Sequence, residues 1–126
     1  MIDMKLEKHL IKQIQQRLSI YQQTGHIEWW SRLNSGSVKT YYGSHIKMCD
    51  KGTPDFLALV NGKEGLIALF IEAKSESGTL RPEQMAFMTK YQSHPYINML
   101  VLKDIYKLNE YIDLYAVDMV EKCLGG

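Results

Sequence analysis

The segment Thr53–Lys74 reads TPDFLALVNGKEGLIALFIEAK and contains two apolar runs, one on each side of a short polar stretch. Runs that are apolar along their full length are typical of strands whose two faces are both covered. Asn61-Gly62 between them is a strong hairpin signal, and the five residues from Asn61 to Gly65 indicate a loop slightly longer than a two-residue turn. The segment therefore predicts a β-hairpin at the centre of a sheet.

The flanking sequence predicts helices and further strands. An amphipathic helix is expected from about Met4 to Gln23, with Asp3 as its cap, and another begins at Pro82. Their apolar stripes are Leu6, Leu10, Ile11, Ile14, Leu18 and Tyr21 in the first, and Met85, Phe87, Met88 and Tyr91 in the second. Strands are expected within 27–34, 38–42 and 96–102, and a helical region begins at Asp104. The order α-β-β-β-α-β-α predicts the α/β class, with a central mixed sheet flanked by helices.

Composition limits the kinds of protein this can be. With 126 residues, 45% of them hydrophobic, the chain is expected to form one domain over 1–126. No apolar run approaches the roughly 20 residues that span a bilayer, and the first residues are a poor match to a signal peptide, so we expect a soluble, cytoplasmic protein. Cys49 and Cys123 are expected to be reduced thiols, and the four scattered histidines complete no zinc site with them.

Overall charge does not indicate a nucleic-acid partner, because the net charge is only +1. One local stretch, residues 32–51, does carry four basic residues against one acid, with Tyr41, Tyr42 and His45 interleaved. Composition alone favours a solvated loop or hairpin here. The alternative is a phosphate-binding surface, whose basic residues would be Arg32, Lys39, Lys47 and Lys51.

Polar residues occur where a sheet core would not choose them. Asp55 precedes the first apolar run, and Glu72 and Lys74 follow the second. Residues two apart on a strand point to the same face, so Glu72 and Lys74 project together, and a hairpin would set Asp55 beside them. Two carboxylates and an ammonium in one pocket are suited to a hard divalent cation and to phosphodiester hydrolysis. The ordinary alternative is a salt bridge at a strand end and an aspartate in a turn.

Two helical residues have the phase to join this group. Glu7 precedes Ile11 and Ile14 by four and seven positions, and Gln84 precedes Phe87 and Met88 by three and four. Both therefore lie on the inner faces of their helices, where a carboxylate or an amide needs a partner. The alternatives are that Glu7 complements the helix dipole and that Gln84 closes a helix cap.

These motifs together resemble the PD-(D/E)xK nuclease superfamily, and specifically the stand-alone VRR-NUC domain of phages and bacteria. The matching segments are 52–55 (GTPD), 71–74 (IEAK), 80–84 (LRPEQ) and 32–36 (RLNSG), together with the amino-terminal helix that contains Glu7. The resemblance extends to about Leu102. One departure is Arg81, where the family often has a Ser or Thr as helix cap. Arginine is a weaker cap, and the expected placement of Gln84 depends on this end of the helix.

The resemblance implies a restriction-endonuclease-like core and a metal-dependent endodeoxyribonuclease. Asp55 and Glu72 would bind Mg²⁺ or Mn²⁺, with Glu7 as a further ligand directly or through water. Lys74 would serve the attacking water, and Gln84 would support the site. It also implies a homodimer that nicks branched DNA, four-way (Holliday) junctions in particular. The DNA-binding residues would be Arg32, Asn34, Lys39, Lys47 and Lys51.

Other functions remain open at this stage. One alternative is a nuclease for linear duplex, flaps or single strands, and another is a DNA-binding module without catalysis. Nicking both strands of a junction symmetrically requires two sites related by a two-fold axis, which is a reason for dimerisation that does not depend on the resemblance. The candidate interfaces are faces bearing Trp29, Trp30 or the tyrosines of the last helix, although core packing is the ordinary use of any one aromatic residue.

Overall fold

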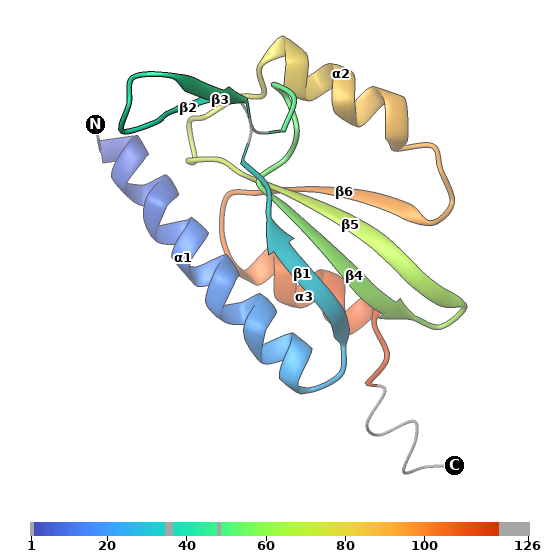
Figure 1. The fold of residues 1–126 in the computed structure, drawn as a ribbon. Coiled ribbons are helices and arrows are strands. Elements are labelled where there is room, and N and C mark those ends of the chain that lie inside the picture. Colours follow the sequence, from blue (N-terminus) through green and yellow to red (C-terminus); the bar gives the residue numbers. More distant parts are fainter. Residues whose placement is uncertain (1, 35–36, 48, 119–126) are drawn as a thin grey trace.

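The fold was obtained as a computed structural model, which describes residues 2–34, 37–47 and 49–118 (Figure 1). Within these ranges the helices are α1 (Ile2–Gln23), α2 (Pro82–Tyr91) and α3 (Tyr106–Tyr115). Its strands are β1 (Ile27–Arg32), β2 (Ser37–Lys39), β3 (His45–Lys47), β4 (Phe56–Gly62), β5 (Gly65–Ala73) and β6 (Ile97–Leu102). The predicted α/β class with helices around a sheet is confirmed.

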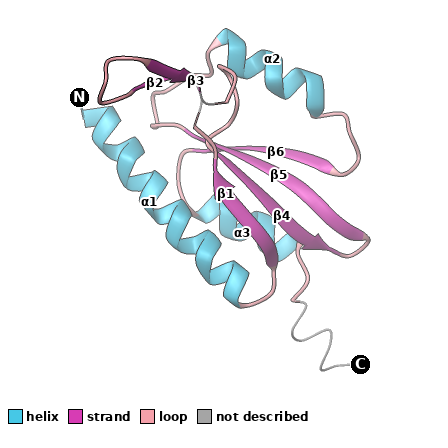
Figure 2. Ribbon diagram, in the orientation of Figure 1, coloured by secondary structure: helices cyan, strands magenta, loops and turns pink. Residues whose placement is uncertain are grey.

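Four strands form the main sheet in the order β1-β4-β5-β6 (Figure 2). β1 and β4 are antiparallel, as are β4 and β5, whereas β6 runs parallel to β5 after the crossover through α2. The sheet is therefore mixed, as expected. The two long apolar runs occupy the two central strands, which is why they lack the alternation of a strand with one wet face.

Helices cover both faces of this sheet. On one face, Phe56, Ala58 and Val60 of β4 are fully buried in a core that includes residues of α1 and α3. On the other face, Phe70 of β5 packs edge-to-face on Phe87 of α2, with ring centroids 5.1 Å apart. Consecutive strand residues alternate between these faces, so each central strand contributes to both layers.

The β4–β5 turn differs from the prediction of a longer loop. Gly62 pairs with Gly65, which leaves only Lys63 and Glu64 in the turn. Asn61 lies within the strand and is 7% exposed, and its side-chain amide donates to the Gly25 carbonyl at 2.9 Å. The Asn-Gly pair is thus held in place by contacts with the segment before β1, and the turn forms two residues later.

The helix predictions need small corrections. α1 begins at Ile2, so Asp3 lies inside the first turn and is not the cap. Leu6 and Met85, both assigned to apolar stripes, are 53% and 55% exposed. Leu6 and Met85 each adjoin a residue on the inner face of the helix but point away from that face themselves. In α1 the buried positions are Leu10, Ile14 and Leu18.

A second sheet, β2–β3, is a separate two-stranded hairpin that projects from the end of β1 (Figure 1). β2 overlaps the strand expected over 38–42 at residues 38 and 39, whereas residues 41 and 42 lie in a turn, and β3 was not predicted. The structure has no helix long and apolar enough to span a membrane among the described residues. Cys49 is a free thiol, as expected, and Cys123 lies outside the described residues.

Candidate active site

Asp55 and Glu72 are brought together by the register of the central hairpin. Phe56 pairs with Ile71, so the next position in the same register sets Asp55 opposite Glu72. Directly opposed residues of an antiparallel pair point to the same face, with Cβ atoms roughly 5 Å apart. That face is the one opposite Phe56, and it lies beneath α2. A turn centred on Asn61-Gly62 would instead have set Asp55 opposite Ala68, so the position of the turn decides the site.

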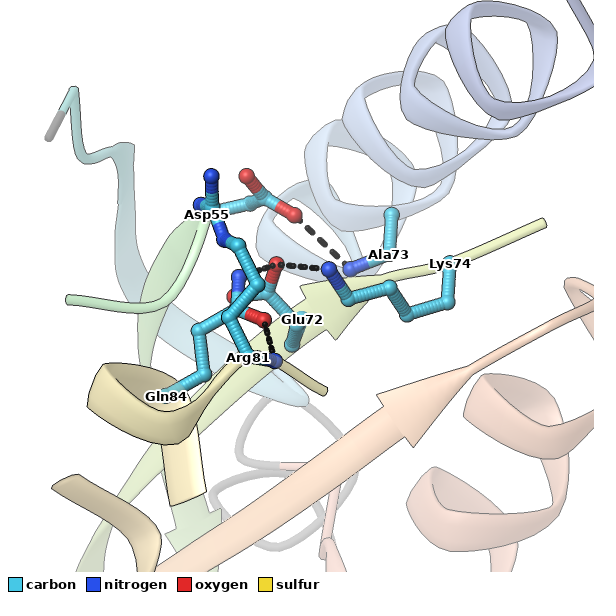
Figure 3. A network of polar contacts seen from close by, with 6 residues as sticks. All are labelled: Asp55, Glu72, Ala73, Lys74, Arg81 and Gln84. Carbon is cyan, nitrogen blue, oxygen red and sulfur yellow. Dashed lines mark hydrogen bonds and ion pairs between the residues drawn. The ribbon is translucent and has the colours of Figure 1, made fainter. Parts of the chain in front are cut away.

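Glu72 is the centre of a compact polar network (Figure 3). It is 7% exposed, and its Oε1 accepts a hydrogen bond from Gln84 Nε2 at 2.9 Å. The Nζ atom of Lys74 lies 3.8 Å from the same oxygen. Lys74 reaches this position because it is two residues along the strand direction and therefore on the same face.

Asp55 is held by the backbone of the neighbouring strand. Its Oδ2 accepts a hydrogen bond from the Ala73 amide at 2.8 Å (Figure 3). The Ala73 side chain is itself buried in the opposite layer, so only its amide takes part. Sequence reasoning missed this contact, and no sequence signal identifies it, because every residue except proline carries the same donor.

The electrostatics of the Glu72 network favour an added positive charge. The pKa of Glu72 is raised to about 8, first because burial removes water from the carboxylate and then because Asp55 lies beside it. Lys74 opposes this effect, whereas a hydrogen bond with Asp55 and the charge of Glu7 add to it. Without a bound metal, Glu72 thus retains its proton at neutral pH.

The donor set fits a hard divalent cation. Mg²⁺ commonly binds through one or two carboxylates and completes its coordination with water and phosphate oxygens. Asp55 and Glu72 supply two such carboxylates. Glu7 is half-buried near them, close enough to raise the pKa of Glu72. Among the described residues, no group of three acidic, histidine or cysteine side chains is close enough together to hold a metal by itself.

Gln84 makes both contacts that the sequence left as alternatives. Its Oε1 accepts a hydrogen bond from the Arg81 backbone amide at 2.8 Å, and its Nε2 donates to Glu72. The first contact caps α2, for which the Arg81 side chain makes no capping hydrogen bond. Gln84 is 4% exposed, so the cap fixes the amide that orients Glu72.

The basic residues predicted to bind DNA are spread over the segment that leads to Asp55. Arg32, Asn34, Lys39 and Lys51 are all exposed. Lys51 Nζ lies 3.4 Å from Glu83 Oε1, next to Gln84 in sequence. The side chain of Lys47 lies outside the described part of the structure. Of the four whose side chains the structure describes, none is part of the Glu72 network.

Comparison with known families places this site in context. The profile of the VRR-NUC domain matches residues 4–102, from α1 to the end of β6. Asp55, Glu72, Lys74 and Gln84 all lie within the match, and α3 follows it. Searches of curated proteins and of solved structures gave no match.

Proposed function

Because the chain belongs to the VRR-NUC domain family and is therefore a nuclease acting on DNA, we propose that Asp55, Glu72 and Lys74 form its metal-dependent active site. The observation that carries this proposal is the register that opposes Asp55 to Glu72, with Lys74 Nζ 3.8 Å from Glu72. In this proposal the protein is an endonuclease that hydrolyses phosphodiester bonds.

Asp55 and Glu72 would hold Mg²⁺ or Mn²⁺, and Glu7, which does not complete a three-residue cluster with them, would contribute through water. Nucleases of this type generally depend on a divalent metal. When bound, such an ion supplies positive charge against the phosphate and acidity for a coordinated water. The raised pKa of Glu72 supports this assignment, because a bound cation would offset both the loss of hydration on burial and the repulsion from Asp55 that raise it.

The other residues of the network have roles that follow from their contacts. Lys74 is positioned to orient the attacking water, or to stabilise the negative charge that develops on the phosphate. Gln84 fixes the direction of the Glu72 carboxylate through its 2.9 Å hydrogen bond. The Ala73 amide does the same for Asp55. A site held in this way needs little rearrangement when the substrate binds.

DNA would approach along the segment between β1 and β4. This segment carries exposed basic residues and ends just before Asp55. The residues that would contact phosphates there are Arg32, Asn34, Lys39, Lys47 and Lys51. For the substrate we propose branched DNA, four-way junctions in particular, cut by a homodimer. One domain with one site cuts one strand, so symmetric nicking of a junction needs two sites related by a two-fold axis.

A nicking assay tests this proposal. Synthetic four-way junction, flap, linear duplex and single strand are incubated side by side with Mg²⁺ or Mn²⁺, for the wild type and for Lys74→Ala. We expect divalent-dependent nicking that is fastest on the junction and is lost in Lys74→Ala. Lys63→Ala, which removes an exposed lysine from the β4–β5 turn, is the matched control and should cut like the wild type.

The outcomes separate the parts of the proposal. Full activity in purified Lys74→Ala would refute the site assignment. Equal cutting of all four substrates would remove the selectivity for branched DNA but leave the site intact. If sedimentation under assay conditions shows that the active species is a single protomer, the proposed homodimer is refuted.

A further inference from the structure

The tip of the β2–β3 hairpin presents two adjacent tyrosines to solvent. Tyr41 and Tyr42 are 97% and 92% exposed, and their rings contact each other edge-to-face with centroids 5.4 Å apart. The next most exposed large hydrophobic side chain among the described residues is Tyr106, at 77%. Neither tip ring adds to the core, so folding does not explain this pair.

The tip is a closed turn. The Thr40 amide donates to the Ser44 carbonyl at 2.7 Å, and the Gly43 amide donates to the Thr40 carbonyl at 3.0 Å. The Thr40 and Ser44 hydroxyls are also hydrogen-bonded, at 2.7 Å. Gly43 has φ +85, a conformation that glycine adopts without strain. The two rings are therefore carried by a hydrogen-bonded turn, whose backbone loses little further freedom when they bind a partner.

The base of the hairpin is attached to the candidate active site. The Leu33 amide donates to the carbonyl of Asp55 itself at 2.7 Å, and the Cys49 amide donates to the Asn34 carbonyl at 2.6 Å. The hairpin thus starts and ends beside the strand end that carries the catalytic carboxylate, and it projects away from the main sheet (Figure 1). Backbone contacts therefore hold the chain on either side of the hairpin next to Asp55.

The charge and length of the hairpin suit DNA. Lys39, at the end of β2, is exposed, and so is His45 at the start of β3. From Asn34 to Tyr41 an extended chain spans at most roughly 23 Å, at about 3.3 Å per residue. With about 3.4 Å per nucleotide along a strand, the tyrosines can reach up to roughly seven nucleotides from the base of the hairpin.

We propose that Tyr41 and Tyr42 bind DNA by stacking on base faces that are exposed where the duplex is interrupted, as at a branch point. Inside a continuous duplex each base is covered by its neighbours, whereas an interruption uncovers π faces that aromatic side chains can stack on whatever the base. This inference rests on the proposed function, and it gives the preference for branched DNA a physical source outside the catalytic residues.

The test measures binding without cleavage. Fluorescence anisotropy in the presence of a chelator compares a four-way junction with a linear duplex of the same sequence, for the wild type, Tyr41→Ala and Tyr42→Ala. Stacking is worth about 1–3 kcal/mol per base, so each alanine variant should bind the junction roughly 5- to 150-fold more weakly. Binding to the duplex should change by less than about twofold, since no uncovered base face is lost there.

Three variants make the result specific. Tyr41→Phe and Tyr42→Phe keep the ring and should retain junction binding. Tyr106→Ala removes another exposed tyrosine, at the start of α3, and should bind like the wild type. With 2-aminopurine beside the branch point, wild-type binding should quench the fluorescence, and the alanine variants should not.

The outcomes distinguish this inference from the proposed function. If the wild type prefers the junction and the alanine variants keep that preference and the quenching, the stacking role is wrong while the proposed function stands. If the phenylalanine variants lose as much affinity as the alanine variants, the hydroxyls rather than the rings make the contact, which also overturns it. If the wild type binds junction and duplex equally, both the branch-point inference and the proposed selectivity fail, whereas the catalytic assignment is untouched.

Discussion

The two faces of the central hairpin are occupied by side chains of opposite character. Against α1 and α3, Phe56, Leu69 and Ile71 are fully buried among apolar neighbours. Beneath α2, the end of the same two strands carries Asp55 and Glu72, with burial that raises the pKa of Glu72. The first face stabilises the fold, and the second gives up stability to hold two carboxyl groups close together. Consecutive residues along these strands thus have different roles, because their side chains point to different faces.

Substitutions at two adjacent residues, one on each face, should show the largest difference between the faces. Asp55→Asn should reduce cleavage by at least about 10²–10³-fold, because loss of a carboxylate that we propose to hold the metal would remove several kcal/mol of transition-state stabilisation. The free energy of unfolding of Asp55→Asn should be unchanged or higher, since one of the two negative charges that face each other is gone. Phe56→Ala should instead lower the free energy of unfolding by about 3–5 kcal/mol, through lost burial and a residual cavity.

Single-turnover cleavage and urea unfolding measure the two effects. The comparison fails if Asp55→Asn unfolds as easily as Phe56→Ala, because the carboxylate would then be a structural residue. Leu57→Ala is the control for side-chain truncation in β4: Leu57 is half-buried on the α2 face, so its cost should be smaller than that of Phe56→Ala.

The pH dependence of stability distinguishes the faces in a single protein. Glu72 has a pKa of about 8 in the folded protein against an ordinary 4.5, so the folded state binds the proton more tightly than the unfolded chain does. Its contribution to stability is therefore complete below pH 4.5 and is lost as the pH rises through about 8. In metal-free protein, this group should lower the free energy of unfolding by about 2–4 kcal/mol across that range.

Glu72→Gln provides the reference, because an amide does not ionise over this range. Urea unfolding in the presence of a chelator should give a flatter pH profile for Glu72→Gln than for the wild type, with the largest difference at the alkaline end. Parallel profiles would mean that the pKa of Glu72 is not raised in the folded protein, so that neither burial nor Asp55 penalises its charged form.

Periodicity in the sequence was enough to predict much of this arrangement. The two apolar runs identified β4 and β5, and the two-residue spacing of Glu72 and Lys74 placed them on one face. The phase of Gln84 against Phe87 and Met88 placed its amide inward. All three follow from local geometry, which a single sequence contains.

The rest depended on contacts between distant residues. The loop expected over Asn61–Gly65 is instead a two-residue turn at Lys63-Glu64, because Asn61 bonds to the segment before β1, and no local preference encodes that contact. The same shift fixed which residue opposes Asp55. β3 is only three residues long and reads His-Ile-Lys, so it has no periodicity to detect, and its pairing with β2 alone makes it a strand.

The smallest expected effect concerns how α2 is held over the polar face. Gly52 has φ +96, and a Cβ added there would lie 2.5 Å from the Glu83 carbonyl oxygen, next to Gln84. Gly43 has a similar φ of +85, but a Cβ there would meet nothing within 4 Å. Both alanine variants therefore carry the strain of a positive φ. Only Gly52→Ala must also displace the first turn of α2, whose backbone carbonyl cannot swing away as a side chain would.

We expect Gly52→Ala to lose about 1–2 kcal/mol more free energy of unfolding than Gly43→Ala, because the excess reports only the steric clash. It should also slow junction cleavage by up to about tenfold, since shifting Gln84 loosens the orientation of Glu72. Urea unfolding and single-turnover cleavage give the two numbers. Equal stability losses in the two variants would mean that the loop before Asp55 yields to α2 without resistance. Gln84 would then be positioned by its own hydrogen bonds to Arg81 and Glu72, and the polar face would not depend on close packing of this loop against α2.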